Sequence, residues 1–482
     1  MSDPLPSNVM YYVNQIAGYS KNTVRLQNLN SETAGPAAGA SQTTVTMPTN
    51  SIINLKSLSL HCNYQPSNMP MTNSTPGSET YDRVYALCPK DGISALVQRL
   101  SWSAGGVALD NGPTPYNVIQ AVKNNTEVAM DRVLSDQKVL NNSVIEEYSL
   151  GSGVNYVQFE TNDDSTPLIC NEWAGFTEAA PCFLDTNMLP ELRLTIQWEG
   201  ANAVPIQYED DTNNSPDGSL KLLQLGQVPQ TEAGLRLPTS CSYSLRNMFW
   251  TVEVISFSNG LLDAMNEQIM SEDGALDVVY PQYQIFSVDG QSTTGSVRGG
   301  VSTMSLDRVY GLMRKVEKAP GTYTPGDNPA ALSYLNQQTP TQLGFSQIGP
   351  KFINGAQNFF SQGVDSYQFK INNAPYPLYR ETKLGGYNSL VCAENRPYSK
   401  HGGSQITSRF VWFDNNWTPV VSLCHEGSNR FISGLDLRSI NSQINWDYYG
   451  SGANPQTRQV LLMTKQSSLL KIGQGRQLAV VN

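Results

Sequence analysis

Residues 188–198 read MLPELRLTIQW, and from position 192 onward apolar and polar side chains alternate. Successive side chains of a β-strand point to opposite faces, so this alternation predicts a strand with one buried and one solvent-facing side. The same period of two recurs at residues 58–62, 250–254 and 367–371. Antiparallel sheets that pack face to face are built from such strands, whereas parallel α/β sheets read as unbroken apolar runs. The sequence therefore predicts an all-β sandwich protein.

The length and composition indicate two domains with extended loops. A chain of 482 residues exceeds what one hydrophobic core usually supports. Charged residues make up 15% of the sequence, below the roughly 25% of an average soluble domain. Asn, Ser, Thr, Gln and Gly supply the polar surface instead, and these residues favour turns over helices. Five long polar stretches are predicted to be loops, at residues 27–50, 64–80, 141–166, 199–240 and 318–350.

Only a few short helices are predicted. Thr114 and Pro115 form a favourable cap and first-turn pair, so a helix is expected from there through Val122. A second helix is expected over residues 261–270, which end before a glycine. Residues 7–16 have a weakly amphipathic pattern, for which an N-terminal helix and a frayed terminus remain equal alternatives.

The best candidate for a domain boundary lies near residues 240–262, where a predicted strand leads into the second helix. The chain is accordingly divided into an N-terminal segment (1–25), a first domain (26–257) and a second domain (258–482). Between the halves, SALVQRL at 94–100 faintly echoes MSLDRV at 304–309. This echo is too short to indicate a duplication.

The charge of the chain argues against nucleic-acid binding. The formal net charge is −10. A protein that neutralises phosphates gathers Lys and Arg on one face or arm, but residues 1–50 contain only Lys21 and Arg25 as basic groups. We therefore expect no direct contact with a genome.

The cysteines and the apolar runs indicate the compartment. The seven cysteines include no CxxC pair, which is typical of reduced thiols in a reducing environment. The sequence begins without a charged leader followed by an apolar run, so no signal peptide is expected. It also lacks any stretch of about eighteen apolar residues, so no membrane span is expected.

The histidines do not form a recognisable metal motif. His61, His401 and His425 lie far apart in the sequence, which gives a zinc site little support. His61 falls on the polar face of a predicted strand, where a solvated surface histidine is the simpler interpretation.

Two segments superficially resemble functional loops. Residues 401–404, HGGS, are similar to an oxyanion loop of esterases, but no GxSxG elbow accompanies them. Residues 209–217 are acidic enough to suggest calcium, but Pro216 stands where the sharp turn needs glycine. The sequence also lacks a phosphate-binding glycine loop, and it does not pair two carboxylates as a glycosidase requires. We therefore predict no enzyme, no cofactor, and no catalytic, cofactor-binding or metal-binding residues.

Five blocks of the sequence carry a family resemblance: DGISALVQRLSWSAGGVALDNG (91–112), MLPELRLTIQW (188–198), YSLRNMFWTVEVIS with LLDAMNEQIM (243–270), YQFKINNAPYPLYRE (367–381) and NRFISGLDLRSINSQINWDYY (429–449). In order and spacing they resemble the double jelly-roll major capsid proteins of tailless double-stranded DNA viruses. That group includes virophages, polinton-like viruses, large eukaryotic DNA viruses and membrane-containing phages. Each block is a strand pattern with turn residues, so the resemblance rests on their combination, from about residue 50 to the end.

The resemblance implies a fold and a use. Each domain would be an eight-stranded antiparallel jelly roll, with a few short helices and long loops, standing upright in a virus shell. Three copies would form a pseudo-hexameric homotrimer, and lateral contacts between trimers would build the icosahedral capsid of a virion assembled inside the host cell. Penton and minor or cement capsid proteins are further implied partners, with an inner membrane beneath the shell as another. The loops at 199–240 and 318–350 would face outwards.

Other classes of protein fit the sequence less well. A secreted or surface carbohydrate-binding β-sandwich protein usually has a signal peptide, paired cysteines and clustered exposed aromatic residues, none of which is evident. A β-sandwich hydrolase lacks a recognisable nucleophile or metal set. A minor or penton capsid subunit commonly has one roll, and the length of 482 residues argues against it.

Overall fold

The computed structural model consists of β-strands with two α-helices and a few 3-10 turns in its described part, which confirms the predicted all-β class. It describes residues 19–67, 83–87, 92–110, 112, 115–126, 158–159, 165–200, 206–209, 242–257, 267, 275–290, 293–315, 359, 363–393, 417–424, 434–438, 442–451 and 458–481.

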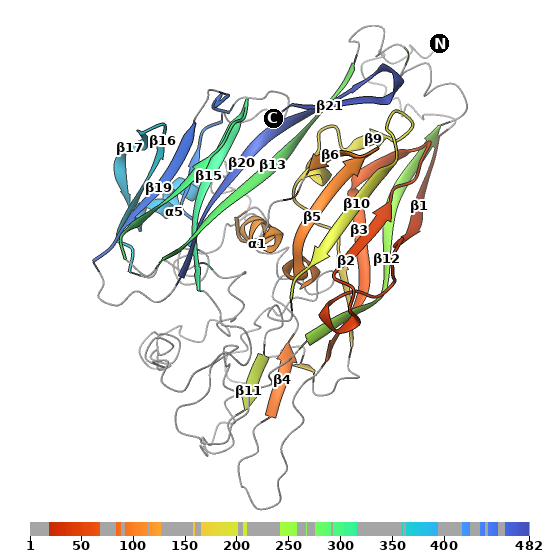
Figure 1. The fold of residues 1–482 in the computed structure, drawn as a ribbon, viewed down its shortest axis with the longest axis horizontal. Helices are drawn as coiled ribbons and strands as arrows, with labels where there is room; N and C mark the ends of the chain where they lie inside the picture. Colours follow the sequence, from red (N-terminus) through yellow and green to blue (C-terminus); the bar gives the residue numbers. More distant parts are fainter. Residues whose placement is uncertain are drawn as a thin grey trace, which may run out of the picture.

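The first sandwich contains two main sheets (Figure 1). One sheet has the strand order β1-β12-β3-β8, with the short β9 added beside β3, and the other has the order β2-β10-β5-β6. The strands are β1 (Tyr19–Gln27), β2 (Gln42–Thr46), β3 (Ile52–Ser67), β5 (Val97–Ala104), β6 (Val107–Asp110), β8 (Thr166–Cys170), β9 (Phe183–Asp185), β10 (Leu192–Trp198) and β12 (Ser242–Phe257). A small third sheet of order β11-β4-β7 extends from one end of this sandwich: β4 (Arg83–Leu87), β7 (Gln158–Phe159) and β11 (Ile206–Glu209).

The second sandwich is built in the same way. One sheet has the order β13-β20-β15-β18, with β21 added beside β20, and the other has the order β14-β19-β16-β17. The strands are β13 (Ala275–Gly290), β14 (Gly295–Gly300), β15 (Leu306–Lys315), β16 (Ser366–Ile371), β17 (Ala374–Thr382), β18 (Val420–Ser422), β19 (Gln443–Tyr449), β20 (Arg458–Gly473) and β21 (Gln477–Val481).

The two sandwiches have the same strand topology. When the eight main strands of each are numbered along the chain, leaving out β4, β7, β9, β11 and β21, both give sheets of order 1-8-3-6 and 2-7-4-5. Within each sheet, every pair of neighbouring main strands is antiparallel. This is the jelly roll, in which two four-stranded sheets share one core. The predicted pair of tandem eight-stranded jelly rolls is therefore confirmed.

The equivalence extends to the helices. Helix α1 (Tyr116–Thr126) lies between strands 5 and 6 of the first sandwich, and α5 (Gly385–Ala393) lies between strands 5 and 6 of the second. The helix expected after Pro115 is thus confirmed as α1. Helix α5 was not predicted, because it opens with two glycines and follows a strand directly. Apart from Glu267, the helix expected at 261–270 lies outside the described residues, as do residues 7–16.

The alternating patterns mark the buried faces as expected. Strand β10 is buried at each of its four apolar positions, and β16 at Tyr367, Phe369 and Ile371. Burial of such side chains is the main favourable contribution to folding. The largest fully buried side chains are tryptophans, two in each sandwich: Trp102, Trp250, Trp417 and Trp446.

Some loop predictions need correction. Residues 27–50 include β2, whose Thr43 and Val45 are buried because the strand pairs with β10. A short polar strand of this kind is stabilised by the strand it pairs with. Its own sequence therefore shows little alternation of apolar and polar residues. Strand β3 also runs on to Ser67, inside the loop predicted at 64–80. Short strands also lie inside two other predicted loops, β7 in 141–166 and β11 in 199–240. Most of the remainder of these two stretches, and all of 318–350, lie outside the described residues.

The division of the chain into 1–25, 26–257 and 258–482 remains a prediction. The observed pairing assigns residues 19–25 to the first sandwich, because β1 is hydrogen-bonded to β12 from Tyr19 to Gln27. Strand β12 ends at Phe257 and β13 begins at Ala275.

Candidate functional site: the joint between the two sandwiches

The two sandwiches meet where β13 crosses from the second sandwich onto the rim of the first (Figure 1). Val279 of β13 and Ala180 of the first sandwich form an isolated antiparallel bridge. The Ala180 N–H donates to the Val279 carbonyl at 2.7 Å, and the reverse bond is 3.1 Å long. Strand β13 lies at the edge of its own sheet, so its outward backbone groups are available for this contact.

Tyr280 anchors the joint. Its side chain is 1% exposed, and its ring meets Phe176 edge-on with the centroids 5.1 Å apart. The hydroxyl donates to the carbonyl of Leu109 in β6. Burial, followed by the nearby charge of Asp110, raises the pKa of Tyr280, so the phenol stays neutral and acts as a donor. An aromatic residue that fills a dry pocket and satisfies its hydroxyl is typical of an interface anchor.

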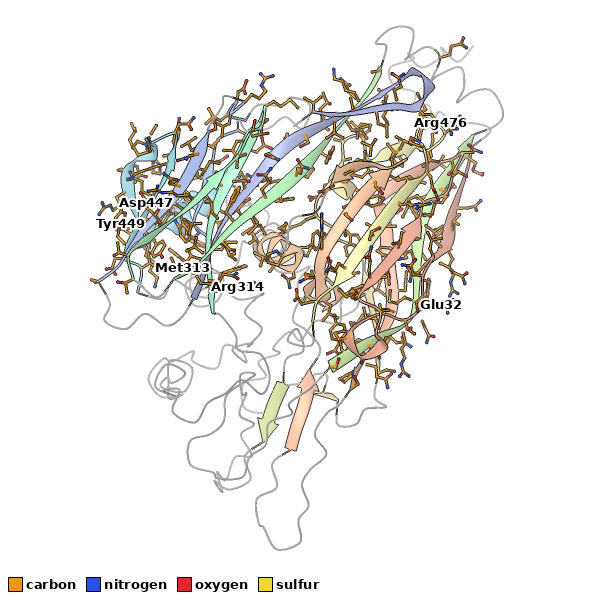
Figure 2. All side chains as sticks on the ribbon, viewed as in Figure 1. Glu32, Met313, Arg314, Asp447, Tyr449 and Arg476 are labelled. Carbon is orange, nitrogen blue, oxygen red and sulfur yellow. The ribbon has the colours of Figure 1, made fainter. Side chains whose placement is uncertain are left out.

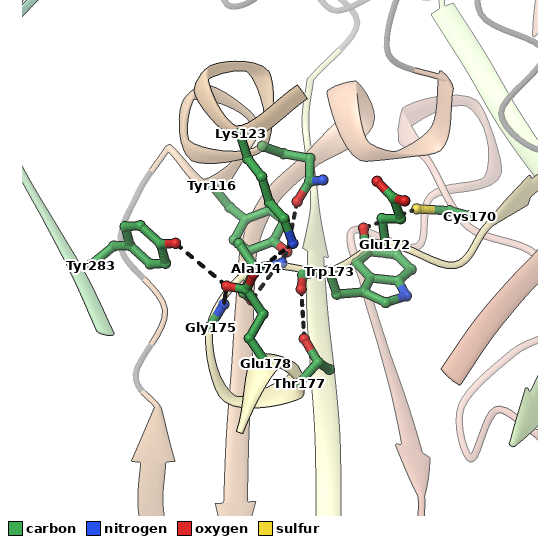
Figure 3. A network of polar contacts seen from close by, with 11 residues as sticks. Tyr116, Lys123, Cys170, Glu172, Trp173, Ala174, Gly175, Thr177, Glu178 and Tyr283 are labelled. Atoms are coloured by element: carbon green, nitrogen blue, oxygen red, sulfur yellow. Dashed lines mark hydrogen bonds and ion pairs between the residues drawn. The ribbon is translucent and has the colours of Figure 1, made fainter. Parts of the chain in front are cut away.

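A polar network centred on Glu178 lies at the joint and includes Tyr283 of β13 (Figure 3). Glu178, at the end of the 3-10 turn Phe176–Glu178, forms an ion pair with Lys123 of α1 at 2.7 Å. Its Oε2 also accepts from the hydroxyl of Tyr283 at 3.4 Å and from the N–H of Gly175 at 3.3 Å. Tyr283 belongs to β13, so Glu178 connects the helix of the first sandwich to a strand of the second.

Helix α1 is fixed beneath the network by a second tyrosine. The hydroxyl of Tyr116 accepts from the N–H of Ala174 at 2.7 Å. Thr177 hydrogen-bonds to the carbonyl of Trp173 at 2.7 Å and stabilises the same turn. Nearby, burial raises the pKa of Cys170 to about 12, so this cysteine is a neutral thiol and a poor nucleophile.

Asp110 is the buried charge of the joint. It is 4% exposed, at the end of β6. Its carboxylate accepts from the N–H of Gly112 at 2.9 Å and from the backbone of Phe176. Burial raises its pKa to about 6, although both backbone bonds and the more distant Arg99 lower it. Desolvation of the charged form is the dominant cause.

Of the residues considered as possible sites from the sequence, His61 is the one whose side chain lies in the described part of the chain. His61 lies on the polar face of β3, but it is half-buried, since it stacks on Phe249 at 4.6 Å and contacts Thr251 at 3.1 Å. Burial, followed by Arg25, lowers the pKa of His61. The segment 401–404 and His425 lie outside the described residues, as does 209–217 except for the backbone of Glu209.

The described ranges contain neither a metal-ligand cluster nor a membrane-spanning helix. There, no group of three or more His, Cys, Asp or Glu side chains is placed to hold a metal ion. Within the same ranges no helix is long and apolar enough to cross a bilayer. The five cysteines described are not joined by disulfides. The absence of enzymatic chemistry stays a prediction.

The joint residues were missed by sequence reasoning. Tyr280, Glu178, Lys123 and Asp110 come from four separate segments, and period-two alternation does not say which segments meet. Asp110 gave no signal either, because it follows Val107, Ala108 and Leu109, a run in which apolar and polar residues do not alternate.

No family model and no curated protein matches the sequence. Solved structures match in fold over nearly the whole chain. The structure of the Sputnik virophage gives a TM-score of 0.55 at 9% identity, covering 100% of this chain and 92% of that one. The Faustovirus major capsid protein gives 0.55 at 10% identity, covering 96% and 92%. A model of the PBCV-1 virus capsid gives 0.54 at 11% identity, covering 99% and 100%. The chain therefore has the double jelly-roll fold of these capsid structures.

Proposed function

We propose that this chain is the major capsid protein of an icosahedral virus and that it is located in the shell of the virion. Three copies associate into a pseudo-hexameric tile, and tiles contact one another laterally. The proposal rests on a single observation: one chain forms two sandwiches of identical strand order, joined side by side. Three such chains present six similar walls, which is the requirement for a six-sided tile built with threefold symmetry.

The composition is consistent with tiling. A charged fraction of 15% allows walls to approach without strong repulsion, while the net charge of −10 keeps free trimers soluble. The joint is held by two backbone bonds, the Tyr280 anchor and the hydrogen bond from Tyr283 to Glu178, which link the two sandwiches of a chain directly. Sandwiches linked in this way suit a wall that makes repeated lateral contacts.

The further partners follow from this proposal. Penton and minor or cement capsid proteins would complete the shell, with an inner membrane beneath it as another neighbour. Direct binding of the genome by this chain is not expected, given the negative net charge and the two basic groups in residues 1–50.

The test is the mass of the purified full chain, followed by electron microscopy. We expect a stable species of three times 52.9 kDa by light scattering and six-sided particles about a threefold axis. A chain that stays monomeric at high concentration would contradict the proposal, and affinity of that monomer for sugars would favour a carbohydrate-binding sandwich.

A further inference from the structure

Strands β13 and β20 run from the second sandwich onto the rim of the first. Arg476, in the turn that follows β20, lies beside the first sandwich, whereas Met313, which pairs with Val460 near the other end of β20, lies in the second (Figure 2). The two strands pair over sixteen residues each without a shift in register. Their even-numbered residues therefore share one face along the whole length.

This even-numbered face is directed into the core of the second sandwich at one end. Phe286 belongs to it, and a Cβ atom added to Gly299 of the opposite sheet would lie 2.3 Å from the Phe286 ring. At the other end the same face reaches the first sandwich, because Tyr280 also belongs to it and bonds to Leu109. One continuous face thus contributes to both the core and the joint.

The face changes character along its length. It is apolar where it reaches the first sandwich, polar in the middle and apolar again inside the second sandwich. In order, the cross-strand pairs are Leu276 with Ile472, Val278 with Leu470, Tyr280 with Ser468, Gln282 with Gln466, Gln284 with Thr464, and Phe286 with Leu462. We call the pairs of Gln282 with Gln466 and Gln284 with Thr464 the polar rungs.

The polar rungs are shielded from solvent on the β20 side. Thr464 and Gln466 are both 0% exposed, as is the neighbouring Ser468. Burying a hydroxyl or an amide costs free energy unless each polar atom finds a hydrogen-bond partner. The partners of these side chains therefore decide whether the crossing is stable.

Direct hydrogen bonds satisfy only part of the rungs. Gln466 Nε2 and Ser468 Oγ both donate to Gln282 Oε1, each at 3.0 Å, so both lone pairs of that oxygen are used. Gln466 Oε1 and Thr464 Oγ1 have no partner among the described residues. Turning both amides over does not remove the problem. Gln282 would then donate to Gln466 and Ser468, and Gln466 Nε2 would be the unpaired atom.

The spacing of the two unpaired groups suits one water molecule. Residues two apart on a strand lie about 6.6 Å from each other on the same face, and a water that bonds to two oxygens spans about 5.6 Å between them. Water both donates and accepts, so it fits either orientation of the Gln466 amide. A metal cation fits less well, because the polar rungs contain no carboxylate to compensate its charge.

We propose that Thr464 and Gln466 form a buried water-binding site at the point where β13 and β20 pass from the second sandwich to the first. A water-mediated bond is nearly as favourable as a direct one. The strands therefore keep their hydrogen bonding across the crossing, although their apolar packing is interrupted there. The inference goes beyond the proposed function, since it applies to the single chain and to the trimer alike.

The first experiment is a crystal structure of the unaltered full chain at about 1.5 Å resolution, at which ordered waters are seen but the amide orientation is still assigned from its partners. We expect density for a water that lies about 2.7–3.2 Å from both Thr464 Oγ1 and the Gln466 amide. Density at oxygen contacts of about 2.3–2.6 Å would indicate a metal cation. Either a cation or the absence of ordered density overturns the proposal.

The second experiment is a double-mutant cycle with Thr464→Val and Gln466→Met, measured by equilibrium urea unfolding. Each substitution nearly keeps the shape of the side chain and removes one partner of the water. Because both variants lose the same water, the rise in the unfolding equilibrium constant of the double variant should fall short of the product of the single effects by about threefold or more.

The matched control cycle combines Thr464→Val with Ser468→Ala. Ser468 bonds directly to Gln282, so it does not share the water, and the two effects should multiply to within about twofold. A shortfall as large as that of the first cycle would contradict a shared water.

The single variant Thr464→Val gives a further outcome by its sign. We expect the unfolding equilibrium constant to rise by about fivefold, because loss of the water leaves the Gln466 amide buried and unpaired. A fall would show that the hydroxyl has no partner and that the site is dry. Trimer formation is measured on the same unaltered chain, and its failure would count against the proposed function alone.

Discussion

The two sandwiches share a strand order but differ in what covers strand 5. In each, a buried aromatic residue on strand 4 lies directly opposite a buried acid on strand 5: Trp102 opposite Asp110, and Tyr367 opposite Glu381. Each acid also precedes the helix that leads to strand 6. This repeated arrangement exists whether or not a neighbour is present. The surroundings of strand 5 differ: in the first sandwich Tyr280 reaches it at Leu109, although Val107 is still 40% exposed, whereas in the second Leu378 and Tyr379 are 88% and 63% exposed.

The difference lies in which contacts are made within one chain. Tyr280 of the second sandwich bonds to strand 5 of the first at Leu109, so that contact forms as the chain folds. Leu378 and Tyr379, on strand 5 of the second sandwich, are exposed. Residues inside each core and at the joint should therefore have the largest effects on stability.

The largest expected effect is in the core of the second sandwich. Trp446 is fully buried and lies 6.1 Å from Trp417 and 5.6 Å from Tyr448, measured between ring centroids. Trp446→Ala should lower the free energy of unfolding by about 3–5 kcal/mol, because it leaves a large cavity. Hydrogen exchange should show that β20 loses protection first while β12 of the first sandwich keeps more of it.

Trp446→Phe is the control for this prediction, since it keeps an aromatic ring in the same place. It should cost clearly less than the alanine variant. A loss below about 1 kcal/mol for Trp446→Ala would contradict the packing described, because alanine variants of buried tryptophans lose several times more.

Next in size is the anchor of the joint. Tyr280→Ala removes the ring that contacts Phe176 and the donor that reaches Leu109. We expect a loss of about 3 kcal/mol from the cavity and the unpaired carbonyl. Tyr280→Phe keeps the ring and should cost about 1 kcal/mol. Urea unfolding of both variants gives the comparison, and equal losses would show that the ring contributes little.

Much of the fold could be predicted from local pattern. The alternation at 192–198 and at 367–371 marks strands whose inner faces are buried as expected. The pair Thr114 and Pro115 correctly places the start of α1. These signals depend on neighbouring residues only, which is why they can be read without the structure.

The missed features depend on contacts between distant segments. Strand β2 is short and rich in threonine, and it is stabilised by its pairing with β10. The echo between residues 94–100 and 304–309 falls on strand 4 of one sandwich and strand 3 of the other, so it does not reflect the repeat. The true repeat is in strand order and in the aromatic and acid pairs, which local sequence similarity does not reveal. The joint depends on tertiary placement throughout.

A smaller effect is expected from the titration of Asp110. Its pKa is raised from 3.8 to about 6 in the folded chain, so folding favours the protonated acid. The stabilisation is complete only well below pH 4 and is lost as the pH rises through about 6; of a total of about 3 kcal/mol, roughly 2 kcal/mol is lost between pH 4 and 7. Urea unfolding between pH 4 and 7 should show this decline in the unaltered chain.

Asp110→Asn provides the comparison for the pH series, since it cannot titrate. Its absolute stability will change, because two backbone N–H groups share the carboxylate. The informative quantity is the difference in pH dependence between the two chains. Identical slopes between pH 4 and 7 would mean that Asp110 is solvated.

The smallest expected effect compares an ion pair of the joint with an exposed one. Lys123 and Glu178 have side chains that are 15% and 22% exposed, whereas Arg193 and Glu191 are 49% and 47% exposed. Partial burial reduces screening by water and salt, so the joint pair should be coupled more strongly. A double-mutant cycle with Lys123→Met and Glu178→Gln should give a coupling free energy of about 1 kcal/mol.

The matched cycle with Arg193→Met and Glu191→Gln should give less than about 0.5 kcal/mol, since both partners are well solvated. The two coupling energies should also respond differently to salt. Raising the ionic strength should reduce the small exposed coupling first, because mobile ions reach that pair freely. Equal couplings in the two cycles would mean that water reaches the joint pair as freely as the exposed one.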